Sequence, residues 1–118
     1  MKRFTLSLTV AGVLAALAAA LPAGAAVAKL NGVVGPGATI SLKQGSKAVS
    51  SVKAGKYSLV VSDKSPFHNF RLKGPGVNVA TSVKATGSKT FSVTLRKGTY
   101  TIVCDPHKSM MKRTLTVR

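Results

Sequence analysis

From Lys29 onward the chain consists of short runs of β-forming residues, and this pattern restricts the possible folds more than any other feature. Runs of Val, Ile, Thr, Tyr and Phe are separated by Gly, Pro, Ser and Lys, and no apolar repeat at a spacing of three to four residues is sustained. The pattern is typical of strands joined by tight turns. It predicts an all-β fold, a two-sheet β-sandwich of seven to eight strands. We expect strands at residues 29–34, 39–43, 57–62, 67–73, 90–96, 99–104 and 113–117, with a further short one near 46–52.

Alternation of apolar and polar residues indicates which side chains face the core of this sandwich. Cys104 ends one predicted strand on the same face as Ile102, and His68 lies near the start of another strand on the same face as Phe70. Successive side chains of a strand point to opposite faces of the sheet. Cys104 and His68 are therefore both expected to point inward.

The first 28 residues have the organisation of a secretory signal peptide. Lys2 and Arg3 precede an apolar stretch over residues 4–21, and Ala26-Val27-Ala28 supplies an A-x-A cleavage site. Cleavage after Ala28 leaves a single domain, residues 29–118. An uncleaved membrane anchor is the alternative, because about 18 apolar residues nearly span a bilayer.

The predicted signal places the domain outside the cytoplasm, in the periplasm, the cell envelope or the extracellular space. No second apolar run of spanning length follows, so no integral membrane span is expected once the signal is cleaved. Exported domains of this size often depend on disulfides, but the chain has one cysteine and cannot form an internal bridge. That thiol is either free, linked to another chain, or bound to a metal.

The ligand types near the end of the chain favour a metal. Cys104, His107 and the methionine pair Met110-Met111 lie within eight residues, and His68 precedes Cys104 by 36 residues. A thiolate, two imidazoles and a weak axial thioether form the ligand set of a blue-copper electron-transfer site. Zinc is a poorer match, because one histidine and a methionine would have to complete its tetrahedral set. A lone histidine or cysteine is usually an ordinary core residue, so the prediction depends on their joint occurrence.

These motifs resemble the cupredoxin superfamily, the type 1 copper proteins that include plastocyanin, pseudoazurin and amicyanin. The resemblance lies in Cys104-Asp-Pro-His107 followed by methionine, in the pair His68-Asn69, and in Tyr100 four residues before the cysteine. It implies a Greek-key β-sandwich with one type 1 copper ion at one end. It also implies that the edge of His107 serves as the electron port.

Three features of the predicted copper site leave alternatives open. Strand alternation after the loop favours Met111 as the axial ligand, whereas amicyanin-like counting forward from the cysteine selects Met110. Arg113 stands where the family usually has glycine, and an arginine there can change the turn and weaken the axial position. Asn69 either ties the two ligand loops together or lies on a polar face.

Charge narrows the classes of function. The chain carries 18 Lys and Arg against 2 Asp and Glu, a net charge of +16, which falls to +14 when Lys2 and Arg3 leave with the signal. Such a charge favours anionic partners and resists self-association, so a monomer is expected. The cations are spread along the chain and aromatic residues are few, which argues against nucleic acid. With only Asp63 and Asp105 acidic and no hydrolase triad, no enzymatic activity is expected.

The leading hypothesis is therefore an exported one-electron carrier for an acidic redox partner. The alternative is a copper-handling protein that binds the metal for delivery or tolerance without routine redox turnover. A third is a β-domain that uses its charge on anionic polymers. For the carrier, we expect docking through an apolar patch around His107, formed by Pro66, Pro106 and Met110, with Lys64, Lys108 and Lys112 at its rim.

Overall fold

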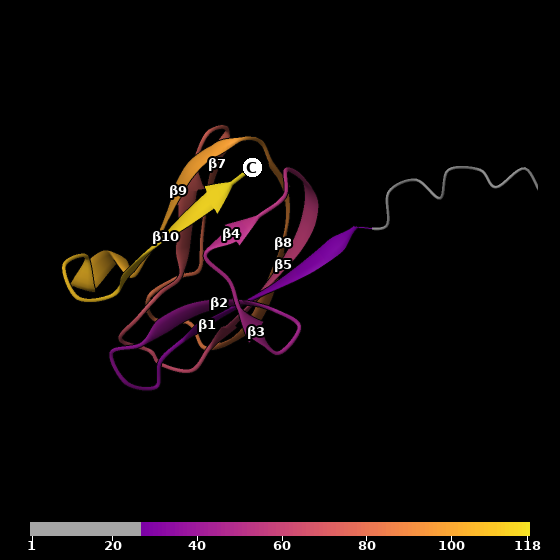
Figure 1. The fold of residues 1–118 in the computed structure, drawn as a ribbon. Helices are drawn as coiled ribbons and strands as arrows, with labels where there is room; N and C mark the ends of the chain where they lie inside the picture. The colour runs from indigo at the N-terminus through magenta and orange to yellow at the C-terminus, as the bar shows by residue number, and fades with distance from the viewer. Residues whose placement is uncertain (1–26) are drawn as a thin grey trace, which may run out of the picture.

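A computed structural model describes residues 27–118, and the predicted signal peptide lies outside the described residues apart from its last two positions. The described chain forms two five-stranded sheets, which pack as a sandwich (Figure 1). No helix in this part of the chain is long and apolar enough to cross a membrane. The first sheet has the order β3-β2-β1-β5-β8 and the second the order β4-β10-β9-β6-β7. The elements are β1 (Ala28–Val34), β2 (Ile40–Gln44), β3 (Lys47–Ala48), β4 (Ser51–Val52), β5 (Gly55–Asp63), β6 (Arg71–Gly74), β7 (Val77–Ala80), β8 (Gly87–Leu95), β9 (Gly98–Val103), the short 3₁₀ helix η1 (Asp105–His107) and β10 (Lys112–Val117).

The all-β sandwich predicted from the sequence is confirmed. Both sheets are mixed: β1 pairs with β5 and β4 with β10 in parallel, and the remaining pairs are antiparallel. Apolar side chains at alternate positions meet between the sheets, as in β5, where Tyr57, Leu59 and Val61 are buried. Burial of this alternating face is the main stabilising contribution to such a fold.

Three local features differ from the predicted strands. The region near 46–52 forms two two-residue strands, β3 and β4, which belong to opposite sheets, so the chain crosses between the sheets there. β7 was not predicted; it pairs antiparallel with β6 after a turn in which Gly76 has a φ of 69°. The strand expected at 67–73 begins only at Arg71. Residues 67–70 are extended or turn-like instead and pass over the end of the sandwich.

One end of the second sheet brings the two ligand-bearing segments together. β6 begins where β9 ends, with Arg71 opposite Val103, and β10 begins beside the same place, with Lys112 opposite Val103. The segment before β6 and the loop between β9 and β10 therefore leave the same edge. In Figure 1 this loop, which contains η1, projects from the sandwich at the end opposite to the start of β1.

Candidate metal centre

His68, Cys104 and His107 meet at this end of the sandwich, within 4.8 Å of one another. His68 comes from the segment before β6, Cys104 follows β9 directly, and His107 closes η1. The Cys104 side chain is completely buried, His68 is nearly so, and His107 is half-buried. The structure thus joins the three residues that the sequence analysis had selected.

The ligand atoms of these residues form a small triangle. The Cys104 Sγ lies 3.7 Å from Nδ1 of His68 and 3.5 Å from Nδ1 of His107, and the two Nδ1 atoms are 3.1 Å apart. The imidazole rings stand edge to face, with an interplanar angle of 73°. A point equidistant from the three atoms lies about 2.0 Å from each, close to the ~2.0–2.3 Å that a first-row metal ion such as zinc takes to nitrogen and sulfur. The residues fit a single ion held by one thiolate and two imidazoles.

Backbone hydrogen bonds give the loop around Cys104 its shape. The Cys104 N–H donates to the Met111 carbonyl at 3.0 Å, and the Cys104 carbonyl accepts from the His107 N–H at 3.0 Å. The Met111 N–H in turn donates to the His107 carbonyl at 2.9 Å. The sulfur also accepts a hydrogen bond from the Asn69 N–H at 3.4 Å. Sulfur and both loop ends are thus fixed by main-chain groups.

The two adjacent methionines have opposite environments. Met111 is 1% exposed and belongs to the hydrophobic core, whereas Met110 is 74% exposed. Arg113, which the sequence analysis flagged as a departure at the loop exit, lies within β10 opposite Ile102. Its Nε donates to the Ile40 carbonyl at 3.3 Å, so the arginine links the two sheets while the strand begins normally.

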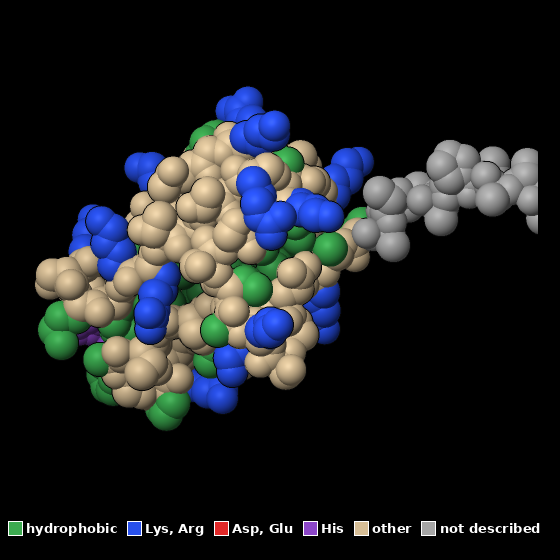
Figure 2. Space-filling model, in the orientation of Figure 1, with side chains coloured by type: hydrophobic (Ala, Val, Ile, Leu, Met, Phe, Trp, Pro, Cys, Tyr) green, Lys and Arg blue, Asp and Glu red, His purple; other side chains and the backbone are tan. Residues whose placement is uncertain are grey.

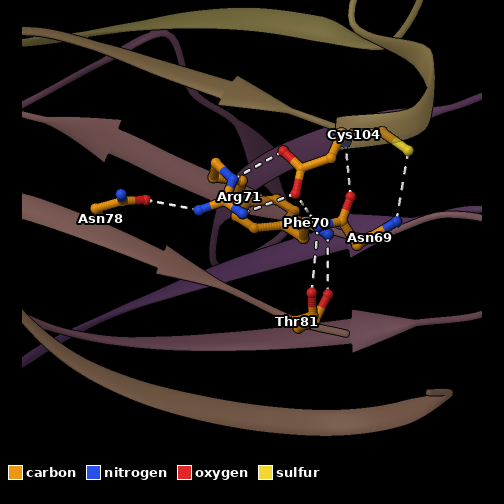
Figure 3. A network of polar contacts seen from close by, with 7 residues as sticks. Asn69, Phe70, Arg71, Asn78, Thr81 and Cys104 are labelled. Atoms are coloured by element: carbon orange, nitrogen blue, oxygen red, sulfur yellow. Dashed lines mark hydrogen bonds and ion pairs between the residues drawn. The ribbon is translucent and has the colours of Figure 1, made fainter. Parts of the chain in front are cut away.

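A second polar layer lies next to the ligands (Figure 3). Asn69 is 1% exposed; its Oδ1 accepts from the Asp105 N–H at 2.7 Å, and its Nδ2 donates to the Asp105 carboxylate at 2.8 Å and to the Thr81 carbonyl at 3.2 Å. Of the two roles left open for Asn69, the structure shows the one in which it ties the ligand loops together. The Thr81 hydroxyl accepts from the Phe70 N–H at 2.9 Å, which gives residues near 70 a partner outside the strand ladder.

The Asp105 carboxylate also forms a two-pronged ion pair with Arg71. Nε donates to Oδ1 at 2.7 Å and Nη2 to Oδ2 at 2.8 Å. These hydrogen bonds from Arg71, reinforced by the one from Asn69, lower the pKa of Asp105 against the opposing effect of partial burial. Sequence reasoning missed Arg71, because only the pairing of β6 with β9 brings it beside a residue 34 positions away.

Several apolar side chains are exposed in the two segments that carry His68 and His107. Figure 2 shows green hydrophobic atoms gathered around a purple histidine at the loop end of the molecule. Pro66, Pro106 and Met110 are exposed, as the docking hypothesis requires. Phe67, which was predicted to lie in a strand, is 73% exposed as well. Its place in a turn before β6, which the sequence pattern concealed, accounts for this exposure.

Comparison with known families gives the centre its context. The sequence model of the copper binding proteins of the plastocyanin/azurin family matches residues 37–118, more than half of the chain. The chain belongs to this family. The predicted cupredoxin membership and the copper cofactor are thereby confirmed.

Solved structures of rusticyanin share the fold of this cupredoxin. Reduced rusticyanin superposes with a TM-score of 0.55 at 18% identity, over 76% of this chain and 78% of the other. A second structure of the copper protein rusticyanin gives 0.56 at 18% identity over 76% of each chain. Rusticyanin from Thiobacillus ferrooxidans gives 0.52 at 18% identity, again over 76% of each. No curated protein matches the sequence.

Proposed function

We propose that this cupredoxin is an exported one-electron carrier with a type 1 copper site formed by His68, Cys104, His107 and Met111. The observation that carries the proposal is the triangle of one sulfur and two Nδ1 atoms, with edges of 3.1 to 3.7 Å, at a buried end of the sandwich. Met111 is the axial candidate, because it is buried and its backbone bonds to both Cys104 and His107. Met110 is exposed, and its backbone N–H bonds to His107 but not to Cys104.

Each ligand has a distinct task in this proposal. Copper, when bound, supplies a one-electron couple between Cu(I) and Cu(II). The soft thiolate of Cys104 suits the reduced ion and the imidazoles suit the oxidised one, so one rigid set serves both states. The hydrogen bond from the Asn69 N–H to Sγ and the folded-back loop hold this set in place. Small rearrangement between the two states favours fast electron transfer.

His107 is the proposed point of electron entry and exit. It is the one candidate ligand among the three that is half-exposed, and the two segments that carry the histidines also expose the apolar side chains Pro66, Phe67, Pro106 and Met110. Apolar surface of this kind marks a place where a partner protein docks. We propose electron transfer and no enzymatic reaction.

The charge near the patch supports an acidic partner. A groove on the outer face of the second sheet is lined by Lys73, Lys108 and Lys112 together with Val103, the residue before Cys104. Its one carboxylate, Asp105, is already paired with Arg71. The remaining cations would face carboxylates of a partner, and complementary charge of this kind accelerates association.

The visible spectrum of the mature protein after addition of Cu(II) tests the site. We expect an intense thiolate-to-copper band that is lost in Cys104→Ser, while Ser109→Ala, an exposed position of the same loop, keeps it. A protein without the band, or a band that survives in Cys104→Ser, would contradict the proposal.

A separate experiment distinguishes the carrier from a copper-handling protein. A carrier shows rapid and reversible oxidation and reduction with its copper retained against a competing chelator. A delivery protein transfers copper to the chelator readily. Fractionation of cells that produce the full chain, with sequencing of the mature N-terminus, tests export and the expected cleavage after Ala28.

A further inference from the structure

The Arg71–Asp105 ion pair occupies a place next to the copper ligands that the proposed function has not used. Asp105 follows Cys104 directly, and its carboxylate accepts three N–H groups: Nε and Nη2 of Arg71 and Nδ2 of Asn69. Arg71 is held from its other side, since its Nη1 donates to Oδ1 of Asn78 at 2.7 Å. The pair therefore connects β6, β7 and the loop after β9 (Figure 3).

The geometry of this pair differs from that of an ordinary surface ion pair. Both prongs are 2.7 to 2.8 Å long, and the two side chains are 31% and 28% exposed. Two parallel bonds between a guanidinium and a carboxylate fix orientation as well as distance. It is also the only ion pair within residues 27–118, although the chain has 18 basic residues.

The position of Asp105 has two consequences for Cys104. Asp105 contributes its backbone N–H to Asn69, and Asn69 contributes its own N–H to the sulfur. Asn69 thus links the Asp105 amide to the sulfur through these two hydrogen bonds. The carboxylate also places a negative charge one residue from the thiolate, and the guanidinium cancels that charge.

We propose that the Arg71–Asp105 pair is a positioning device for Cys104, which fixes the loop through Asn69 and keeps the local charge near zero. Its effect on reduction potential rests on the proposed copper function. Its effect on the loop does not, so the two can be tested separately.

The reduction potential of the copper-loaded protein tests the charge. Arg71→Met leaves an unpaired carboxylate, which favours the more positive Cu(II) state, so the potential falls. Asp105→Asn leaves an unpaired guanidinium, so the potential rises. The double variant removes both charges and returns the potential toward that of the wild type. Shifts of the same sign in both single variants, or no shift in either, would overturn the electrostatic role.

A second variant, Arg71→Lys, distinguishes the effect of the positive charge from that of the hydrogen-bond geometry. It also keeps the test possible if Arg71→Met folds poorly. Lysine keeps the positive charge but lacks the planar fork. We expect its potential to stay closer to the wild type than that of Arg71→Met. An equal fall in both variants would contradict cancellation of charge by Arg71.

Hydrogen exchange of the Asp105 amide in the metal-free protein tests the mechanical role. Arg71→Met and Arg71→Lys should both accelerate exchange several-fold, because Asp105 loses the fork that holds it against Asn69. Lys47→Met is the control: its side chain is exposed on β3, in the other sheet, and it should leave exchange unchanged. Unchanged exchange in both Arg71 variants would overturn the positioning role. Accelerated exchange in a protein without a blue band would support that role and reject the copper carrier alone.

Discussion

At the scale of single residues, the most informative contrast is between two neighbours, Met110 and Met111. The sequence analysis favoured Met111 because strand alternation after the loop should fix its direction. The structure gives the two side chains opposite surroundings, 74% and 1% exposed. Both residues precede β10, which begins at Lys112, and the hydrogen bond from the Cys104 N–H to the Met111 carbonyl holds Met111 beside the buried cysteine. Ligation by Met111 itself stays a prediction.

Replacement of each methionine by leucine tests that prediction. Cu(II) requires more electron donation than Cu(I), so loss of a thioether from Met111→Leu should destabilise the oxidised form and raise the potential. The volume is nearly conserved, and the cost in unfolding free energy should stay below about 1.5 kcal/mol. Met110→Leu should change neither property. Voltammetry of the copper-loaded variants is the measurement, and a larger shift in Met110→Leu would reassign the axial ligand.

Asp105 provides a prediction for the pH dependence of stability in the metal-free protein. Its pKa is lowered in the folded state, chiefly by the hydrogen bonds from Arg71. A carboxylate of this kind stabilises the fold above its unfolded pKa of about 3.9, and the contribution is lost as the pH falls through the lower folded pKa. The free energy of unfolding of the wild type should therefore exceed that of Asp105→Asn by about 1 kcal/mol near neutral pH, and this difference should become smaller in acid.

Urea denaturation of both metal-free proteins between about pH 2 and about pH 7 measures this difference. Because every other residue is common to both proteins, the comparison isolates position 105. A difference that stays constant across the range would show that the ionised carboxylate of Asp105 does not stabilise the fold.

At the scale of elements, the alternation of apolar and polar residues predicted the strands well where an apolar and a polar face could be told apart. Residues 67–70 were the main exception, because their apolar alternation resembles a strand. The structure satisfies their backbone groups elsewhere: the Asn69 N–H bonds to the Cys104 sulfur and the Phe70 N–H to the Thr81 hydroxyl. Such partners depend on the register between strands far apart in sequence. The residue types of His68, Cys104 and His107 allowed their selection as candidate ligands from the sequence. The bond between Arg71 and Asp105 could not be predicted, because it depends on the pairing of β6 with β9.

The packing of β1 against the segment before β6 predicts the effect of a small substitution. A Cβ added at Gly32 would lie 2.7 Å from two ring carbons of Phe70, which is fully buried. Overpacking of this kind costs about 1–3 kcal/mol. Reduced entropy of the unfolded chain offsets about 0.4–1 kcal/mol of that cost. Gly32→Ala should therefore be destabilised by about 1–2 kcal/mol in urea denaturation.

Gly37→Ala is the matched control for this substitution, because a Cβ there meets nothing within 4 Å. Its stability should lie within about 0.5 kcal/mol of the wild type. If Gly32→Ala were as stable as Gly37→Ala, the close contact with Phe70 would not restrict this part of the core.

At the scale of the whole molecule, nearly all charged side chains carry a positive charge. Both acidic residues are already engaged: Asp63 is buried and accepts a hydrogen bond from the Ser65 N–H, and Asp105 pairs with Arg71. The charged side chains of the exposed surface are therefore almost all cationic, and Figure 2 shows Lys and Arg scattered over the visible face. Net charge alone steers an anionic partner toward the molecule but does not orient it. Orientation requires cations close to His107 in the chain, such as Lys108, which follows it directly, and Lys112 at the start of β10.

Electron-transfer rates with small charged reagents separate these two effects. The rate constant with an anion such as hexacyanoferrate should fall as ionic strength rises, and that with a cation such as hexaammineruthenium should rise. The double variant Lys108→Gln/Lys112→Gln should react more slowly with the anion than the double variant Lys56→Gln/Lys97→Gln does. The latter pair removes the same charge from the opposite end of the sandwich. Charges more than a Debye length of about 10 Å from the reacting edge are screened at about 0.1 M salt, so the difference between the pairs should persist there. Equal slowing by both pairs would mean that only net charge acts, and a rate independent of salt would remove electrostatic steering altogether.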